Sequence, residues 1–285
     1  MKKYKTDWYL YYLINVTLII LVSFPIYWAF VSSIKPPNEL ITNTPTLFPI
    51  NPTFENYERI WNLEPTSSRG NVRSAFTNSA IVSIGTVVLS AIISTLAAYA
   101  LTILRTPFRH LIFLLIIMPI LIPGISLLIP LYKLVKELGL MNSYLGLILI
   151  HSTGMLTLGV FLMRNAFMSI PTSLREVALL EGSSELRIMF TVMLPLAIPG
   201  LLTLMVFALY GSWNDFILAF LFVNTIDMEM LNVFLMKLTF AGSQFDTFWG
   251  LLNAGAIISF VPIIVFYIFL QQYFVRGVTG SAVKE

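Results

Sequence analysis

Residues that could do chemistry are few in this chain, and none is arranged for catalysis. His110 and His151 are the only histidines, cysteine is absent, and neither an H-E-x-x-H zinc motif nor a G-x-x-x-x-G-K-[ST] phosphate loop occurs. No pairing of a nucleophile with a base is visible either. We therefore predict no catalytic residue, no metal site and no bound cofactor, and we expect that the chain does not hydrolyse ATP itself.

Some polar residues lie inside long apolar stretches. Asp215 is the only acid well inside one, with Trp213 and Asn214 beside it, and His151 and Asn78 lie in two others. A charged group in a membrane segment usually faces protein or water, so Asp215 either lines a solute path, contacts a partner or lies at a half-solvated helix end. The candidate residues of a solute path are Asn78, His151, Trp213, Asn214 and Asp215, although hydrogen bonding between helices is the default role for His151 and Asn78.

The composition is that of an integral membrane protein. Of 285 residues, 57% are hydrophobic and only 11% are charged, whereas soluble domains have about 45–50% apolar and about 25% charged residues. Disordered chains are polar and rich in charge, which excludes that class. The formal net charge of +3 comes from scattered basic residues, so no nucleic-acid partner is predicted. The partner of most of this surface is the lipid bilayer.

Six stretches are long and apolar enough to cross a bilayer as helices, each of which needs about 20 residues. We predict an all-α membrane protein of a single domain, residues 1–285, and exclude a β-barrel because these stretches are continuously apolar. The predicted spans are about 10–32, 75–101, 110–132, 142–163, 195–220 and 249–272. Prolines in the third and fifth spans mark possible kinks or gating elements.

An even number of spans puts both termini on one side. The short, basic loop Arg105–His110 favours cytosolic N and C termini under the positive-inside rule. The first apolar stretch is too long for a cleaved signal peptide. With this orientation, segment 35–73 is an extracytoplasmic loop and segment 164–192 is a cytosolic loop.

The extracytoplasmic loop 35–73 is much longer than a usual helix connection of about 2–8 residues. Its prolines forbid one continuous helix, although a short helix is plausible around Phe54–Trp61. It is either an ordered cap that faces a partner or a solvated linker.

The cytosolic loop 164–192 contains a short helix at about Leu174–Glu181. Ser173 and Glu176 have the spacing of a capping box at its start, and Gly182 can end it in a left-handed conformation. So short a helix is marginal alone and must dock against something. One face carries apolar residues at i, i+3, i+4 spacing: Leu174, Val177 and Ala178. The acids around that face disfavour binding to anionic lipid, so a protein partner is favoured over the headgroup surface.

The same segment resembles a family signature. Glu176–Gly182 reads EVALLEG, and after nine further residues Val192–Pro195 reads VMLP. This is similar to the E-A-A-x-x-x-G-x9-I-x-L-P signature of the membrane subunits of binding-protein-dependent ABC importers, with Val177 and Val192 as conservative departures. The rest of the chain resembles the carbohydrate branch, specifically the maltose-type second permease. The matching segments are Ser33–Pro36, Glu55–Tyr57, Asn78–Ser79, Ala98–Ala100, Trp213–Phe216 and Gly277–Lys284.

The resemblance implies a six-helix permease of a bacterial inner membrane that imports a carbohydrate. Its implied partners are a homologous second permease, two copies of a cytosolic ABC ATPase, which bind the ATP and Mg, and an extracytoplasmic sugar-binding protein. The loop helix would be the coupling helix, seated in a cleft of the ATPase. The implied coupling residues are Ser173, Glu176, Ala178, Glu181, Gly182, Leu194 and Pro195, and the tail residues near the ATPase are Gly277, Val283 and Lys284.

Two alternatives remain open at this point. The chain could be an ABC permease for a solute other than sugar, or a secondary carrier driven by an ion gradient. The second alternative predicts inverted repeats and several intramembrane charges, whereas the sequence has no obvious repeat and one candidate acid.

Overall fold

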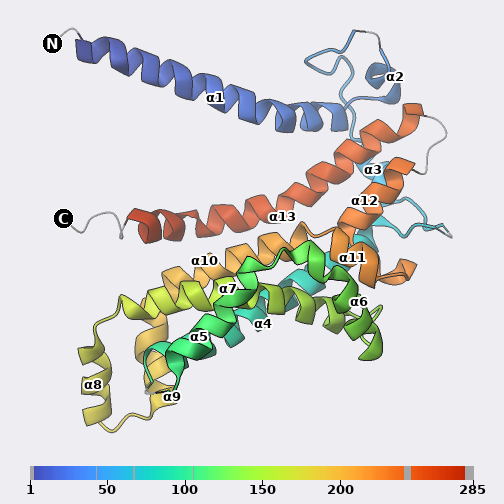
Figure 1. Cartoon of the computed structure of the whole chain (residues 1–285). Coiled ribbons are helices and arrows are strands. Elements are labelled where there is room, and N and C mark those ends of the chain that lie inside the picture. Colours follow the sequence, from blue (N-terminus) through green and yellow to red (C-terminus); the bar gives the residue numbers. More distant parts are fainter. Residues whose placement is uncertain (1–2, 43, 67, 105, 241–244, 280–285) are drawn as a thin grey trace. The chain divides into compact units, whose positions relative to one another are not determined.

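The computed structural model describes residues 3–42, 44–66, 68–104, 106–240 and 245–279 (Figure 1). Every regular element in these ranges is a helix, which confirms the all-α prediction. The chain divides into two compact units, which are described in turn: Met1–Arg73 with Phe234–Pro262, and Ser74–Val233 with Ile263–Glu285.

The first unit is built from the N-terminal helices and parts of two later helices. Its elements are α1 (Lys3–Ser33), α2 (Pro37–Leu40), α3 (Glu55–Trp61), most of α12 (Leu231–Phe240) and the first half of α13 (Phe245–Thr279). The short helix α3 is found where the sequence predicts one. Residues Trp8–Ser33 of α1 are apolar on every side and their side chains are largely exposed, as expected of a helix whose surroundings are lipid or another subunit.

The segment between α1 and α4 is an ordered loop. The buried Asn56 side chain donates to the backbone oxygens of Ser33 at 2.9 Å and Lys35 at 2.8 Å. The Glu39 carboxylate accepts from the two backbone amides of Ile50–Asn51, at 2.9 and 2.7 Å. These buried polar groups tie residues 39–56 back onto the end of α1, so this part of the segment is held by specific hydrogen bonds.

The second unit holds most of the remaining apolar helices. Its main elements are α4 (Val72–Thr102), α5 (Arg109–Ile117), α6 (Leu128–Glu137), α7 (Tyr144–Met168), α8 (Thr172–Leu180), α9 (Glu185–Ile188), α10 (Leu194–Trp213) and α11 (Ile217–Phe222). Short turns complete it: η1 (Met118–Leu121), η2 (Gly124–Leu127), the π-helical η3 (Met189–Met193) and η4 (Ile226–Met228). Helices α7 and α10 pack along their lengths.

Five described helical segments are long and apolar enough to cross a membrane, and a bent pair makes a sixth if it counts as one span. The bent pair is Arg109–Leu121 with Gly124–Glu137, which meet at 96°. The single third span predicted at 110–132 is therefore broken. The break lies at Ile122–Pro123, and the α-helix already gives way to the tighter turn η1 at Met118–Pro119, since proline cannot continue the helical hydrogen-bond ladder.

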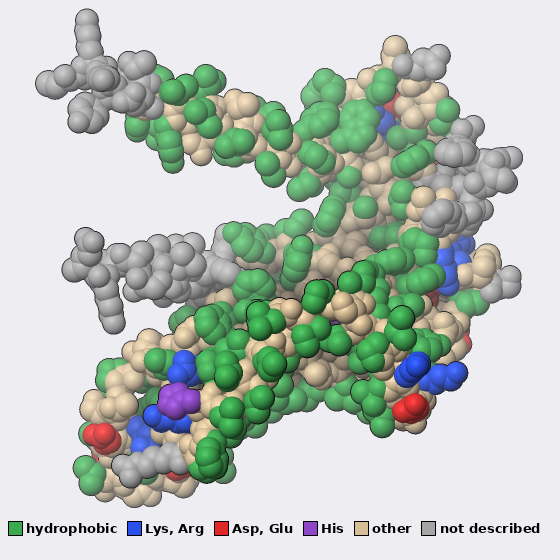
Figure 2. All heavy atoms as spheres, viewed as in Figure 1, with side chains coloured by type: hydrophobic (Ala, Val, Ile, Leu, Met, Phe, Trp, Pro, Cys, Tyr) green, Lys and Arg blue, Asp and Glu red, His purple; other side chains and the backbone are tan. Residues whose placement is uncertain are grey.

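The fifth span ends earlier than predicted. Helix α10 stops at Trp213 and not near residue 220, because the chain turns at Asn214 and begins the separate helix α11. Likewise α7 continues to Met168, so the loop after it is shorter than the predicted 164–192. Figure 2 shows hydrophobic side chains over most of the visible surface, with charged side chains gathered towards the two ends of the second unit.

Candidate functional site

The start of α8 differs from the prediction. The residue before the helix is Pro171, with φ −59° and ψ 131°, and no side chain caps the first turn. Ser173 lies inside the helix and is exposed, so the predicted capping box with Glu176 is wrong. Proline replaces it for a physical reason: its fixed φ suits the chain entering a helix, and it has no N–H that needs a partner.

The end of α8 is as predicted. Gly182 has a φ of +81°, in the left-handed region that glycine adopts without strain. Its N–H donates to the Leu179 oxygen and the Ser183 N–H donates to the Ala178 oxygen, both at 3.0 Å. These two bonds form a Schellman motif, which satisfies the last carbonyls of the helix and turns the chain sharply towards α9.

The faces of α8 are only partly those predicted. Ala178 is 8% exposed and packs inside its own unit, so it does not belong to the exposed apolar surface of α8. Leu174, Val177 and Leu180 are 42%, 54% and 89% exposed. The i, i+3, i+4 pattern identifies an apolar face but cannot tell which of its members turn inward. We call the exposed set Leu174, Val177 and Leu180 the outer face of α8.

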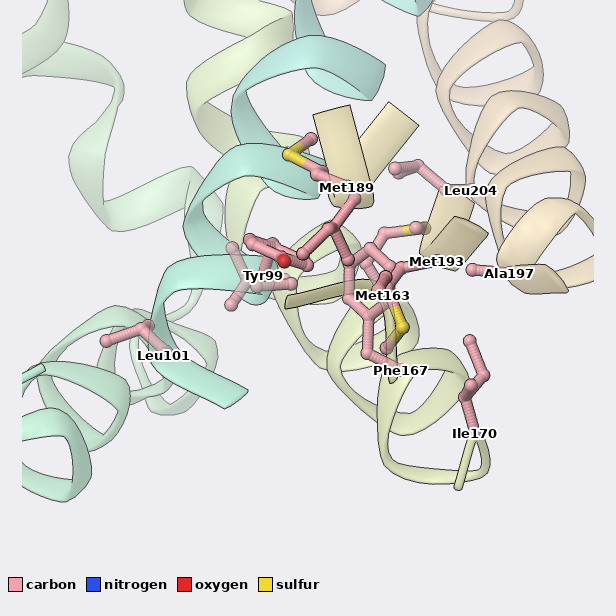
Figure 3. Packing of buried hydrophobic residues seen from close by; sticks show 13 residues of the cluster. Tyr99, Leu101, Met163, Phe167, Ile170, Met189, Met193, Ala197 and Leu204 are labelled. Carbon is pink, nitrogen blue, oxygen red and sulfur yellow. The ribbon is translucent and has the colours of Figure 1, made fainter. Parts of the chain in front are cut away.

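Beneath α8 lies the principal apolar cluster of the second unit (Figure 3). It gathers side chains from several elements, among them Tyr99 of α4, Phe167 of α7, Met189 and Met193 of η3, and Leu204 of α10. The Tyr99 ring meets the Phe167 ring edge to face, with centroids 5.5 Å apart. Ala178 of α8 belongs to this cluster, so α8 packs on it while the outer face stays exposed.

Three polar side chains join α8 to its neighbours. The Arg175 guanidinium pairs with both carboxylate oxygens of Glu185, its Nε lying 3.2 Å from Oε2. The Tyr99 hydroxyl donates to the same Oε2 at 3.0 Å. The Glu185 carboxylate raises the pKa of Arg175 above its ordinary value, mainly through the side-chain hydrogen bond. The sequence reasoning gave none of these residues such a role. We call Tyr99, Arg175 and Glu185 the clamp.

The structure brings two of the predicted path residues together. His151 Nε2 of α7 lies 3.7 Å from Asp215 Oδ2, and the two side chains are only 9% and 14% exposed. The Asp215 carboxylate also accepts from the backbone amides of Leu218 at 3.3 Å and Ala219 at 2.8 Å. It thereby serves the first turn of α11, whose amides lack partners within the helix.

Of the two residues before Asp215, Trp213 is buried and Asn214 is exposed. Trp213 is 4% exposed, its ring stands edge to face against Phe76 with centroids 5.3 Å apart, and its backbone oxygen accepts from Asn232 at 2.9 Å. Asn214 is exposed, and its side-chain amide donates to the Tyr210 oxygen at 3.0 Å.

Asn78 is engaged inside the unit. Its side-chain nitrogen donates to the backbone oxygens of Asp227 at 2.8 Å and Glu229 at 3.0 Å, and its side-chain oxygen accepts from the Tyr144 hydroxyl at 2.8 Å. At 4% exposure it joins α4, α7 and the segment around η4. The structure therefore favours packing over solute contact for Asn78.

The match to a known protein family covers the C-terminal two thirds of the chain. Residues 90–280 match the family described as binding-protein-dependent transport system inner membrane component. The chain belongs to this family. The permease is 32% identical, over 100% of both chains, to a probable starch degradation products transport system permease of Thermoanaerobacterium thermosulfurigenes. It is 33% identical to a trehalose transport system permease of Mycobacterium tuberculosis, over 91% of this chain and 92% of that protein.

A solved structure shares the fold. The chain matches a subunit of a bacterial ABC transporter involved in the import of the acidic polysaccharide alginate, with a TM-score of 0.85 over 96% of this chain and 98% of that chain, at 22% identity. The permease is thus a multi-pass inner-membrane protein and a non-catalytic subunit of a binding-protein-dependent ABC importer. Such an importer works with an ATPase and a binding protein, which decides against an ion-coupled carrier.

The remaining predicted coupling residues lie apart from the outer face of α8. Leu194 and Pro195 open α10 directly after the π-helical η3, within one continuous helical span. Gly277 lies near the end of α13, and Val283 and Lys284 lie outside the described residues.

Proposed function

We propose that this permease imports a carbohydrate, in the form of an oligosaccharide, as one of two homologous permease subunits. Two copies of a cytosolic ABC ATPase would drive it, and an extracytoplasmic sugar-binding protein would deliver the solute. Transport proceeds by alternating access: closure of the ATPase dimer moves α8, and the spans reorient around the path.

The outer face of α8 carries the proposal for the ATPase contact. Leu174, Val177 and Leu180 expose apolar surface at the end of the second unit where the chain leaves the membrane spans. Burying a side chain such as Leu180 in a cleft of a partner contributes about 1.5–3 kcal/mol. The exposed Glu176 and Glu181 flank this face and suit basic groups on the partner.

The solute class is supported by the relatives and by the resemblance to carbohydrate permeases. The two relatives above are named as transport permeases for starch degradation products and for trehalose, and the solved transporter is involved in the import of alginate. Among the predicted path residues, Asn214 is the exposed one and the best placed to meet a solute. Tail residues Gly277, Val283 and Lys284 remain proposed neighbours of the ATPase.

Replacement of Leu180 by Arg tests the ATPase contact. The variant puts a charge into the proposed cleft contact, so the affinity for the ATPase subunits should fall about tenfold or more, equivalent to about 1.4 kcal/mol. The matched control is Leu138→Arg, a 61% exposed leucine at the C-terminal end of α6. Helix α7, with 25 residues, separates the two ends. Co-purification measured by quantitative blotting should fall only for Leu180→Arg, and equal yields for both variants would overturn the contact.

The solute class is tested on the binding protein and then on the whole importer. The binding protein encoded beside the permease is titrated calorimetrically with malto-oligosaccharides, trehalose, alginate oligosaccharides, amino acids, dipeptides and spermidine. A saccharide should bind, and its radiolabelled form should enter proteoliposomes only when ATP is inside with the ATPase. Binding of amino acids, peptides or polyamines alone would overturn the carbohydrate assignment.

A further inference from the structure

The clamp joins two elements that the chain does not connect locally. Tyr99 belongs to the last turn of α4, whereas Glu185 begins α9, 86 residues later. Helix α8 is covalently continuous with α7 before it and with α9, η3 and α10 after it. Movement of α8 therefore reaches α7 and α10 through the backbone, but it reaches α4 only through side chains.

The geometry of the clamp is directional. Arg175 holds both oxygens of the Glu185 carboxylate, an arrangement that fixes the relative orientation of the two groups as well as their distance. The Tyr99 hydroxyl adds a third bond to the same carboxylate. The apolar cluster contains residues of both α4 and α8, but hydrophobic contact is non-directional, so the oriented hydrogen bonds of the clamp add a directional constraint.

The three side chains of the clamp differ in how deeply they are buried, and this difference fits a connection between the core and α8. Tyr99 is 3% exposed and its ring is held against Phe167, so its hydroxyl is a fixed point of the core. The Arg175 and Glu185 side chains are 25% and 36% exposed and lie at the rim. Glu185 is thus the link between the fixed hydroxyl of α4 and the guanidinium carried by α8.

We propose that Glu185 is a positioning residue that makes α8 and the cytosolic end of α4 move as one body. The proposal rests on the proposed function, since it concerns how a push on α8 is passed to the spans. In this account the outer face of α8 contacts the ATPase. The clamp then couples α4 to the movement of α8.

The test uses two spin labels in the assembled importer. Because this chain has no cysteine, Leu96→Cys on α4 and Thr172→Cys on α8 give one defined pair of labels once the partner subunits are also made free of cysteine. Both positions are exposed and lie outside the clamp and the outer face. The distance between the labels is measured by pulsed electron paramagnetic resonance, without nucleotide and with ATP plus orthovanadate.

With the clamp intact, the distance distribution should be the same in both nucleotide states. In Glu185→Gln and in Tyr99→Phe, which keeps the ring packing, the distribution should broaden and shift with nucleotide. Thr191→Val is the matched control, because the Thr191 hydroxyl bonds only within its own turn, to the Arg187 oxygen at 2.7 Å. A distance that shifts in the unaltered clamp, or variants that behave like Thr191→Val, would overturn the proposal.

A second measurement separates this proposal from the ATPase contact. In the permease pair without ATPase subunits, a label at Thr172 should become more mobile in Glu185→Gln and Tyr99→Phe than in Thr191→Val. Equal mobility would overturn the clamp whatever the ATPase does. A clamp that behaves as expected, in a permease that never binds an ATPase, would overturn the proposed function instead.

Discussion

The two ends of α10 carry two polar junctions of opposite character. Before α10, the Arg175–Glu185 pair lies at the rim, with side chains 25% and 36% exposed. After α10, His151 and Asp215 are 9% and 14% exposed, and the Asp215 carboxylate is satisfied by backbone amides of α11. The 20 residues of α10 separate the two junctions.

The difference suggests a division of labour within the second unit. At the Asp215 end, the carboxylate accepts hydrogen bonds from backbone amides and holds a turn in place, so this junction stabilises the fold of the unit. At the Glu185 end, side chains bond to side chains beside an apolar face without a described partner, so this junction can transmit movement from another protein. Substitutions at the Asp215 end should lower the stability of the fold, and substitutions at the Glu185 end should weaken the coupling of the spans to the ATPase.

Asp215→Ala should have the largest effect on stability. It leaves the amides of Leu218 and Ala219 without their acceptor, and two hydrogen bonds to a charged group contribute about 3 kcal/mol together. The free energy of unfolding in mixed micelles should fall by that amount, while the folded fraction still binds the ATPase. The control Asp215→Asn keeps one acceptor oxygen and should lose about half as much. If Asp215→Ala is as stable as the parent protein, the proposed difference between the two junctions is wrong.

Gly182→Ala should have an intermediate effect on stability and a specific effect on assembly. A side chain in the left-handed region costs about 1–2 kcal/mol. Gly139 is a matched control: its φ is +68°, it ends α6 with the same pair of hydrogen bonds, and neither glycine has an atom within 4 Å of an added Cβ. Both alanine variants should lose similar stability, but only Gly182→Ala should weaken ATPase co-purification. Equal loss of co-purification would remove the special role of α8.

His151→Gln should have the smallest effect, about 0.5–1 kcal/mol. Its nitrogen lies 3.7 Å from Asp215, which is beyond a strong hydrogen bond, and the amides of α11 still hold the carboxylate. The same unfolding assay measures it. A loss as large as that of Asp215→Ala would mean that the imidazole, and not the amides, secures this turn.

Local backbone rules predicted some features well. Gly182 ends α8 because only glycine adopts that conformation without strain, and this constraint needs no knowledge of tertiary contacts. The short helix α3 and the long apolar helices also follow from local pattern. By contrast, the proline at position 171 takes the place that the Ser173 capping box was expected to fill.

Features that depend on tertiary contacts could not be derived in the same way. The sequence remains apolar after Asp215, so it cannot show that the chain turns there and starts α11. Periodicity placed Ala178 on the same face as Val177, but only packing against the apolar cluster shows that Ala178 turns inward. The clamp pairs residues 86 positions apart, which no local pattern reveals.

Cross-linking from Leu180 tests the central claim most directly, because the leucine is 89% exposed and the chain has no cysteine of its own. Leu180→Cys and the control Leu138→Cys are each labelled in intact cells with a photoreactive maleimide. The account predicts a cross-link between Leu180→Cys and the ATPase subunit, and none from Leu138→Cys. If Leu180→Cys gives no product with any nucleotide-hydrolysing subunit while the importer is active, the outer face of α8 is not the contact with the ATPase.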